Sequence, residues 1–88
     1  MSSELETLDQ LLGGNLSLKV VRMLYPDEEA FSRGVLGLLS CGDVRLLATD
    51  GAEVLRWQWR ELFVDGAVRG KMDQLQLEIT DQGVQRIA

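Results

Sequence analysis

The segment Arg56-Trp57-Gln58-Trp59-Arg60 holds both tryptophans and two of the nine basic residues of an 88-residue chain whose net charge is −5. Large aromatic rings beside arginines supply either an anchor for a hydrophobic core or a recognition surface for another protein. On a helix, Trp57 and Trp59 point about 200° apart, so one ring is exposed beside Arg56 or Arg60. On a strand, both rings share a face and pack into the core. Both interpretations stay open, and the first makes Arg56, Trp57 and Arg60 the candidate partner-binding residues.

Side chains for catalysis and metal binding are scarce in this chain. It has no histidine, which removes Ser-His-Asp and Cys-His catalysis and the commonest transition-metal ligand. The single cysteine, Cys41, cannot form an intramolecular disulfide or, in a monomer, a zinc site. Its position at the end of an apolar helix predicts a buried, inert thiol. Because the chain also lacks a Gly-x-x-x-x-Gly-Lys-Ser/Thr phosphate-binding run, we expect a non-enzymatic protein with no cofactor and no metal site.

The charge balance bears on nucleic-acid binding. Fourteen acidic residues against nine basic ones put the pI near 4.5, whereas proteins that bind phosphate backbones usually present a basic face. The stretch 45–71 is the least acidic part, with five basic and four acidic residues. A modest basic patch there is the alternative site, formed by Arg45, Arg56, Arg69 and Lys71. Nucleic-acid binding is therefore disfavoured but stays open.

Two helices are expected before Pro26. Ser3 and Glu6 form a capping box that predicts the start of the first helix, and Gly-Gly-Asn at 13–15 predicts its end. Ser17 predicts the start of a short second helix, which ends before Pro26. The residues expected to face the core are Leu5, Leu8, Leu11 and Leu12 in the first helix and Leu18, Val21, Leu24 and Tyr25 in the second.

A third helix is expected from Asp27 to about Ser40. Asp27 is a favourable N-cap, and the acidic pair at 28–29 suits the positive end of the helix dipole. Gly34 and Gly37 lie inside this helix, where each costs about 1 kcal/mol relative to alanine. We expect close approach of a neighbouring helix to offset that cost. The residues expected to face the core are Phe31, Val35, Leu38 and Leu39.

The second half of the chain begins with a predicted hairpin. Residues 44–48 are predicted to be a strand, Asp50-Gly51 is a strong hairpin-turn signal, and residues 53–55 are expected to return antiparallel. We favour a helix over about 56–64 after this return strand, because the alternation of apolar residues breaks beyond Arg60. A loop is expected over 65–70.

The end of the chain combines a strand with a short helix. Residues 75–79 alternate apolar and polar side chains and predict a strand. Thr80 or Asp81 is expected to cap a last helix, with Val84 and Ile87 facing inward.

The pattern Leu-x-Ile-Thr-x-x-Gly-x-x-x-Ile from Leu77 to Ile87 resembles the passage from wing strand to C-terminal helix in winged-helix domains. The order of helices before the strand near Val44 is also similar to that fold. The resemblance implies a winged-helix-like topology over about 16–88 and, as the alternative function, a nucleic-acid-binding regulator. The chain departs from the family in its expected recognition helix, where Arg33 is the only base, and in the tryptophan segment that interrupts the wing. Its overall character is also similar to small uncharacterised cyanobacterial proteins, which implies no function.

Length and composition predict one soluble domain over residues 1–88. Hydrophobic residues make up 45% and charged residues 26%, as in ordinary globular domains. No apolar run is long enough to span a membrane, the N-terminus lacks the features of a secretory signal, and the single cysteine agrees with a cytoplasmic location. We expect an α+β fold of three helices followed by a small antiparallel sheet and one or two short helices. The leading function is a protein-interaction or regulatory module, whose partner is another protein or a second copy of the chain.

Overall fold

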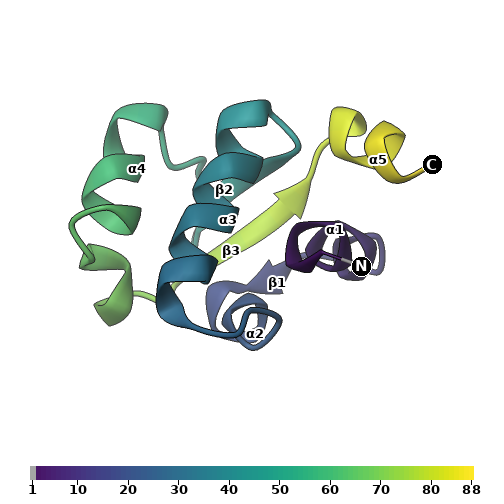
Figure 1. The fold of residues 1–88 in the computed structure, drawn as a ribbon. Helices are drawn as coiled ribbons and strands as arrows, with labels where there is room; N and C mark the ends of the chain where they lie inside the picture. Colours follow the sequence, from purple (N-terminus) through teal and green to yellow (C-terminus); the bar gives the residue numbers. More distant parts are fainter. Residues whose placement is uncertain (1) are drawn as a thin grey trace.

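The computed structural model describes residues 2–88 and has an α+β fold (Figure 1). The elements in chain order are α1 (Ser3–Leu11), β1 (Leu16–Ser17), α2 (Leu18–Arg22), α3 (Glu28–Cys41), β2 (Val44–Ala48), α4 (Arg56–Phe63), the 3-10 helix η1 (Ala67–Gly70), β3 (Leu75–Ile79) and α5 (Asp81–Ile87). Helix α3 runs through the middle of the molecule, while α4 and α5 lie at opposite ends. The predicted class, with helices first and then a small antiparallel sheet with short helices, is confirmed. No helix of the described part of the chain has the length and apolar character needed to cross a membrane.

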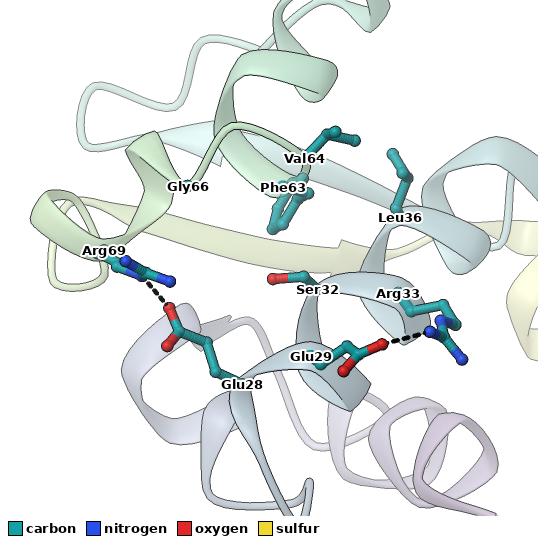
Figure 2. Close-up of a pocket in the computed structure, with 9 residues that line it drawn as sticks. All are labelled: Glu28, Glu29, Ser32, Arg33, Leu36, Phe63, Val64, Gly66 and Arg69. Carbon is teal, nitrogen blue, oxygen red and sulfur yellow. Dashed lines mark hydrogen bonds and ion pairs between the residues drawn. The ribbon is translucent and has the colours of Figure 1, made fainter.

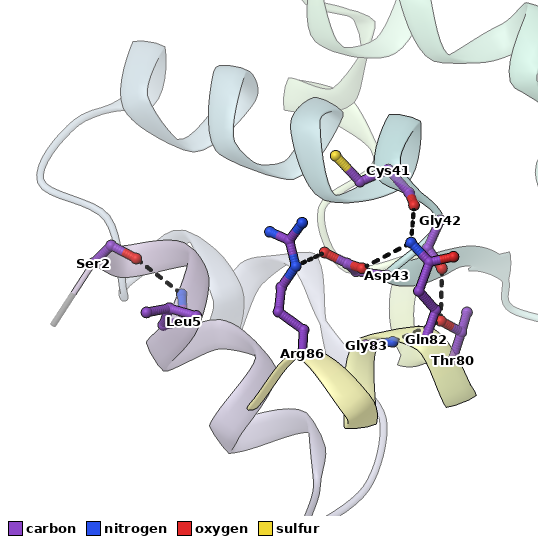
Figure 3. Close-up of polar contacts among 9 residues, drawn as sticks. All are labelled: Ser2, Leu5, Cys41, Gly42, Asp43, Thr80, Gln82, Gly83 and Arg86. Atoms are coloured by element: carbon purple, nitrogen blue, oxygen red, sulfur yellow. Dashed lines mark hydrogen bonds and ion pairs between the residues drawn. The ribbon is translucent and has the colours of Figure 1, made fainter. Parts of the chain in front are cut away.

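Capping residues start the helices where they were predicted, with one shift. Ser17, Asp27 and Thr80 each accept a hydrogen bond from a backbone N–H of the first turn of α2, α3 and α5. Helix α1 begins one residue before the predicted capping box, because Ser2 Oγ accepts from the backbone N–H of Leu5 at 3.2 Å (Figure 3). Two adjacent serines offer the same capping chemistry, so the residue pattern alone does not choose between them.

Helix α1 buries Leu8 and Leu11 as predicted, but its buried face is shifted from the predicted one. Leu5 and Leu12, both expected in the core, are 39% and 53% exposed. Thr7 is fully buried instead, and its hydroxyl donates to the carbonyl of Ser3 at 2.7 Å and lies 3.5 Å from the Tyr25 hydroxyl. A buried hydroxyl is tolerated when it is hydrogen-bonded. Threonine therefore takes a place in the core that hydrophobicity alone does not predict.

The sheet has the strand order β1-β3-β2, and all its pairs are antiparallel. The central strand β3 pairs along its whole length with β2, with Leu46 opposite Leu77. On its other edge it pairs with β1, where Leu16 also lies opposite Leu77. Strand β1 was not predicted, because two residues are too few to show an alternating pattern.

The chain leaves β2 through the predicted Asp-Gly turn. Gly51 has a φ of +85°, in the left-handed region that glycine adopts readily. The return strand predicted over 53–55 is wrong in extent, because only Glu53 forms a bridge, to Leu47. Helix α4 already begins at Arg56, which leaves no length for a ladder.

The core lies between the sheet and helices α1, α2 and α3. Phe31 is fully buried, and its ring meets those of Tyr25 and Phe63 edge to face at centroid distances of 5.9 and 6.3 Å. The close approach predicted for the two glycines of α3 occurs only at Gly34, where a Cβ would lie 2.7 Å from the Tyr25 hydroxyl oxygen. Gly37 is exposed with open space beside it, so the prediction was wrong there.

Helix α5 is held to the turn between α3 and β2 by polar contacts (Figure 3). Asp43, fully buried in this turn, has one carboxylate oxygen 3.1 Å from Nε of Arg86 and the other 3.4 Å from the side-chain amide of Gln82. Thr80 donates from its hydroxyl to the carbonyl of Gly42 at 2.6 Å. The ion pair with Arg86 and the hydrogen bond from Gln82 reduce the cost of burying the Asp43 carboxylate, whose Oδ2 accepts no hydrogen bond from another described residue.

Two side chains near this contact differ from their predicted places. A Cβ at position 83 would clash with the carbonyl oxygen of Asp43, so glycine is the residue that fits where α5 meets this turn. Gly83 therefore faces inward, and its neighbour Val84 is 39% exposed. Cys41 was predicted to be buried and is exposed. It lies about 200° around α3 from the buried Leu39, on the opposite side of the helix.

The segment between α4 and β3, predicted to be a loop, contains η1. Val68 is buried there and attaches the segment to the core. The exposed Arg69 reaches across to pair with Glu28 at the start of α3. This part of the chain therefore packs against α4 and is joined to the start of α3 by an ion pair, so it is not a free connection.

Candidate interaction surface on helix α4

The segment Arg56–Arg60 forms the first part of helix α4, which selects the helical interpretation over the strand. Leu55 is extended, and its backbone N–H donates to Oε1 of Gln58 at 3.2 Å, which satisfies one free donor at the helix start. Leu62 and Phe63 are buried, and their packing stabilises a helix too short to be stable alone.

Trp59 is the core anchor of this segment. Its ring is partly buried against the core, and its Nε1–H donates to the carbonyl oxygen of Val54 at 3.1 Å. The guanidinium of Arg56 lies 5.8 Å from the centre of the Trp59 rings, a cation–π geometry. Trp59 therefore faces the molecule, and Arg56 is held partly by its own chain.

Trp57 points to solvent from the same helix and is 75% exposed. Val64, seven residues on, is 59% exposed, and Arg60 and Glu61 between them are exposed as well. The spacing i, i+3, i+4, i+7 places these four side chains on one side of the helix. We call Trp57, Arg60, Glu61 and Val64 the α4 outer face.

Of the three predicted partner-binding residues, two belong to the α4 outer face and the third borders it. Arg56 and Arg60 both line a depression of about 450 Å³ between α4 and α3, whereas Trp57 lies outside it. Glu61 and Val64 were missed by the sequence reasoning. The available signal was their spacing of four and seven residues from Trp57.

A second depression, of about 560 Å³, continues along α3 and α4 (Figure 2). Its charged side chains are already paired: Arg69 with Glu28, and Arg33 with Glu29 at 2.6 Å. Its apolar lining is formed by Leu36, Phe63 and Val64. The paired charges leave this depression with little electrostatic preference for a ligand.

The alternative basic residues do not gather on one surface. Arg45 pairs with Glu78 at 3.0 Å, and Arg69 pairs with Glu28. Lys71 makes no ion pair with another described residue. Arg45, Arg56, Arg69 and Lys71 line four different depressions. Their positive charge is therefore spread out and partly neutralised.

The chemistry available on the α4 outer face is that of binding. An indole ring, a guanidinium, a carboxylate and an isopropyl group lie within two turns of one helix. Within residues 2–88, no three His, Cys, Asp or Glu side chains cluster in a way that could hold a metal ion.

Comparison of the chain with protein-family models, with curated proteins and with solved structures finds no match in any of the three.

Proposed function

We propose that this chain is a small non-enzymatic cytoplasmic module that binds another protein molecule through helix α4, with Trp57 and Arg60 in the contact and Arg56 at its border. The observation that carries the proposal is the contrast between the two tryptophans. Trp59 is packed and hydrogen-bonded, whereas Trp57 is 75% exposed on an ordered helix. The exposed thiol of Cys41 agrees with the reducing conditions of the cytoplasm.

Burying Trp57 in an interface offers a large return. Removing a large apolar side chain from water contributes roughly 2–3 kcal/mol, and tryptophan next to arginine is the composition found at the energetic centre of protein interfaces. Val64 extends the apolar surface by one helical repeat. Arg60 and Glu61 then supply the charges that fix the orientation of a partner.

The nucleic-acid alternative receives less support. Two of its four residues, Arg45 and Arg69, are already paired with carboxylates, and Arg33 on α3 pairs with Glu29. The element order agrees with the winged-helix resemblance in part, since α4 and η1 separate β2 from β3. Helices α2 and α3 precede β2, and α5 follows β3 directly through the Thr80 cap.

Cross-linked capture from cells that express the chain tests the proposal. Wild type is compared with Trp57→Ala, and Met23→Ala is the matched control, because Met23 is 80% exposed on a different element. We expect a protein retained by wild type and Met23→Ala to be lost from Trp57→Ala, since truncating a central tryptophan weakens binding by roughly 2 kcal/mol or more.

Equal retention by all three chains would contradict the proposal. Retention of nucleic acid that falls steeply with added salt and does not depend on Trp57 would favour the alternative function instead.

A further inference from the structure

The depression of about 450 Å³ between α3 and α4 combines unpaired positive charge with apolar side chains. Within the described chain its lining contains no carboxylate and consists of Leu36, Ser40, Arg56, Trp59, Arg60 and Val64. We infer that the partner places an acidic and apolar segment here, with a carboxylate bound by Arg56 and Arg60 and an apolar side chain on Leu36 and Val64. The inference rests on the proposed function and names the chemistry of the partner.

The two arginines are available to bind an anion. Neither Arg56 nor Arg60 makes an ion pair with another residue of the described chain, although five of the nine basic residues do: Lys19, Arg33, Arg45, Arg69 and Arg86. Like charges one helical turn apart repel each other. A carboxylate placed between Arg56 and Arg60 therefore relieves an unfavourable interaction that is present in the free chain.

Other basic residues line depressions that already contain negative charge. The depressions lined by Arg45, Arg69, Lys71 and Arg86 each include at least one carboxylate. Glu61, which follows Arg60 in the sequence, lines a different depression. An incoming carboxylate therefore meets positive charge beside Arg56 and Arg60 without a competing acid in the lining.

Arg56 is partly ordered before a partner binds. Its guanidinium lies 5.8 Å from the centre of the Trp59 rings, and Trp59 is fixed in turn by the hydrogen bond to Val54. A guanidinium stacked on an aromatic ring keeps N–H donors free at its edge, and two of them can bind one carboxylate in parallel. Less side-chain freedom is then lost on binding, which favours the complex.

The spacing within the depression predicts the spacing in the partner. Arg56, Arg60 and Val64 follow one another at intervals of four residues and form one row along α4, with a rise of about 6 Å between neighbours. Leu36 and Ser40 have the same interval on α3 and form the other side. Figure 2 shows Leu36 and Val64 at the apolar end, where the larger depression begins.

A carboxylate at Arg60 and an apolar group at Val64 are thus about 6 Å apart along the partner. Two residues of extended chain or four residues of helix span about that length. We therefore expect an Asp or Glu two residues from an apolar residue in an extended segment, or four residues from it in a helix.

The affinity of a short segment is expected to be low. Exposed ion pairs stabilise a contact only slightly, and the net charge of −5 opposes an acidic partner at long range. Salt screens that repulsion beyond about 8 Å at physiological ionic strength, so the local arginines decide the preference. We expect a dissociation constant on the order of 1 mM for a short peptide.

An NMR titration of the whole chain with two capped peptides tests the inference. The acidic peptide is Ser-Glu-Glu-Ser-Leu-Ser, and the matched control is Ser-Lys-Lys-Ser-Leu-Ser. We expect only the acidic peptide to shift the backbone amide signals of Ser40, Arg60 and Val64 and the indole N–H signal of Trp59. The shifts are expected to shrink as salt is added, because the contact is partly electrostatic.

Substitutions of the two arginines locate the binding site. Arg56→Gln and Arg60→Gln are each expected to weaken binding of the acidic peptide roughly threefold, the size of one exposed ion pair. Lys71→Gln has the same charge change at an exposed residue of another depression and is expected to bind like wild type. The double variant Arg56→Glu with Arg60→Glu is expected to prefer the lysine peptide.

Three results would overturn the inference. One is equal binding of the two peptides by wild type, and another is the absence of shifts at about 10 mM acidic peptide, ten times the expected constant. The third is a short oligothymidylate of the same charge that shifts these signals more strongly than the acidic peptide, which would assign the arginines to phosphate groups instead.

The cell-capture experiment separates this inference from the proposed function. Capture that depends on Trp57 but is unchanged in Arg56→Gln leaves the proposed function standing and overturns the acidic segment. Equal capture by wild type and Trp57→Ala, with the peptide preference intact, contradicts the proposed function alone.

Discussion

At the scale of single residues, two glycines in helices have opposite surroundings. Gly83 of α5 is buried with its α-carbon against the carbonyl of Asp43, and a Cβ there would also lie 2.8 Å from the side chain of Ile79. Gly37 of α3 has no atom within 4 Å of such a Cβ. The same substitution therefore has opposite consequences at the two positions.

We expect Gly83→Ala to lower the free energy of unfolding by roughly 2–3 kcal/mol, because the backbone must shift to remove the overlap. We expect Gly37→Ala to raise it by roughly 0.5–1 kcal/mol, because alanine is the better helix former where space is free. Urea unfolding of both variants measures the difference. A neutral Gly83→Ala variant would contradict the packing of α5 against the α3–β2 turn.

At the scale of elements, Thr80 contributes two hydrogen bonds to the start and the attachment of α5, beside the contacts of Asp43 with Arg86 and Gln82. Thr80 accepts from the N–H of Gly83 at the helix start and donates to the carbonyl of Gly42 at 2.6 Å. One bond starts the helix and the other holds it to the preceding turn. The strand-to-helix junction therefore depends on a hydroxyl at this position.

Thr80→Ala is expected to lower the free energy of unfolding by roughly 1–2 kcal/mol, as other losses of a helix N-cap do. Thr80→Ser keeps the hydroxyl and is expected to retain most of the stability. Hydrogen exchange at the α5 amides, measured beside denaturant unfolding, should show faster exchange only in the alanine variant. Equal exchange in both variants would mean that the cap does not hold α5.

At the scale of the whole molecule, Tyr25 links stability to pH. Tyr25 is 5% exposed and lies between Thr7 of α1 and Phe31 of α3. Burial is the largest effect and raises the pKa of the Tyr25 phenol above its ordinary value of 10.0. The hydrogen bond with Thr7 partly offsets this rise in the pKa, and the nearby Glu4 carboxylate adds a smaller one. The folded chain therefore keeps this proton at a pH where the unfolded chain loses it.

The sign of the pH dependence follows. Below pH 10 the phenol is protonated in both states and has no effect on the pH dependence of stability. Between pH 10 and the raised folded pKa the unfolded state binds fewer protons, so the free energy of unfolding falls as pH rises. Tyr25→Phe is expected to remove this part of the fall. Thermal unfolding of both chains from pH 8 to pH 11 measures it, and parallel curves would contradict a buried, perturbed phenol.

The sequence by itself determined much of the local structure. Side-chain caps at Ser17, Asp27 and Thr80 start helices through contacts within three residues, and the alternation over 75–79 specifies a strand from its own side chains. The helical spacing of Leu62 and Phe63 likewise favoured α4 over a strand. These features depend on near neighbours, which a single sequence displays.

Only the tertiary structure decided which faces are buried and which side chains are free. The two-residue strand β1 exists because β3 offers it a partner, and Thr7 is buried because its hydroxyl lies beside Tyr25. The same holds for the α4 outer face. Trp57 is exposed because Trp59, two residues on, takes the place in the core. Such outcomes depend on residues far apart in the chain, and the pattern around one position does not contain them.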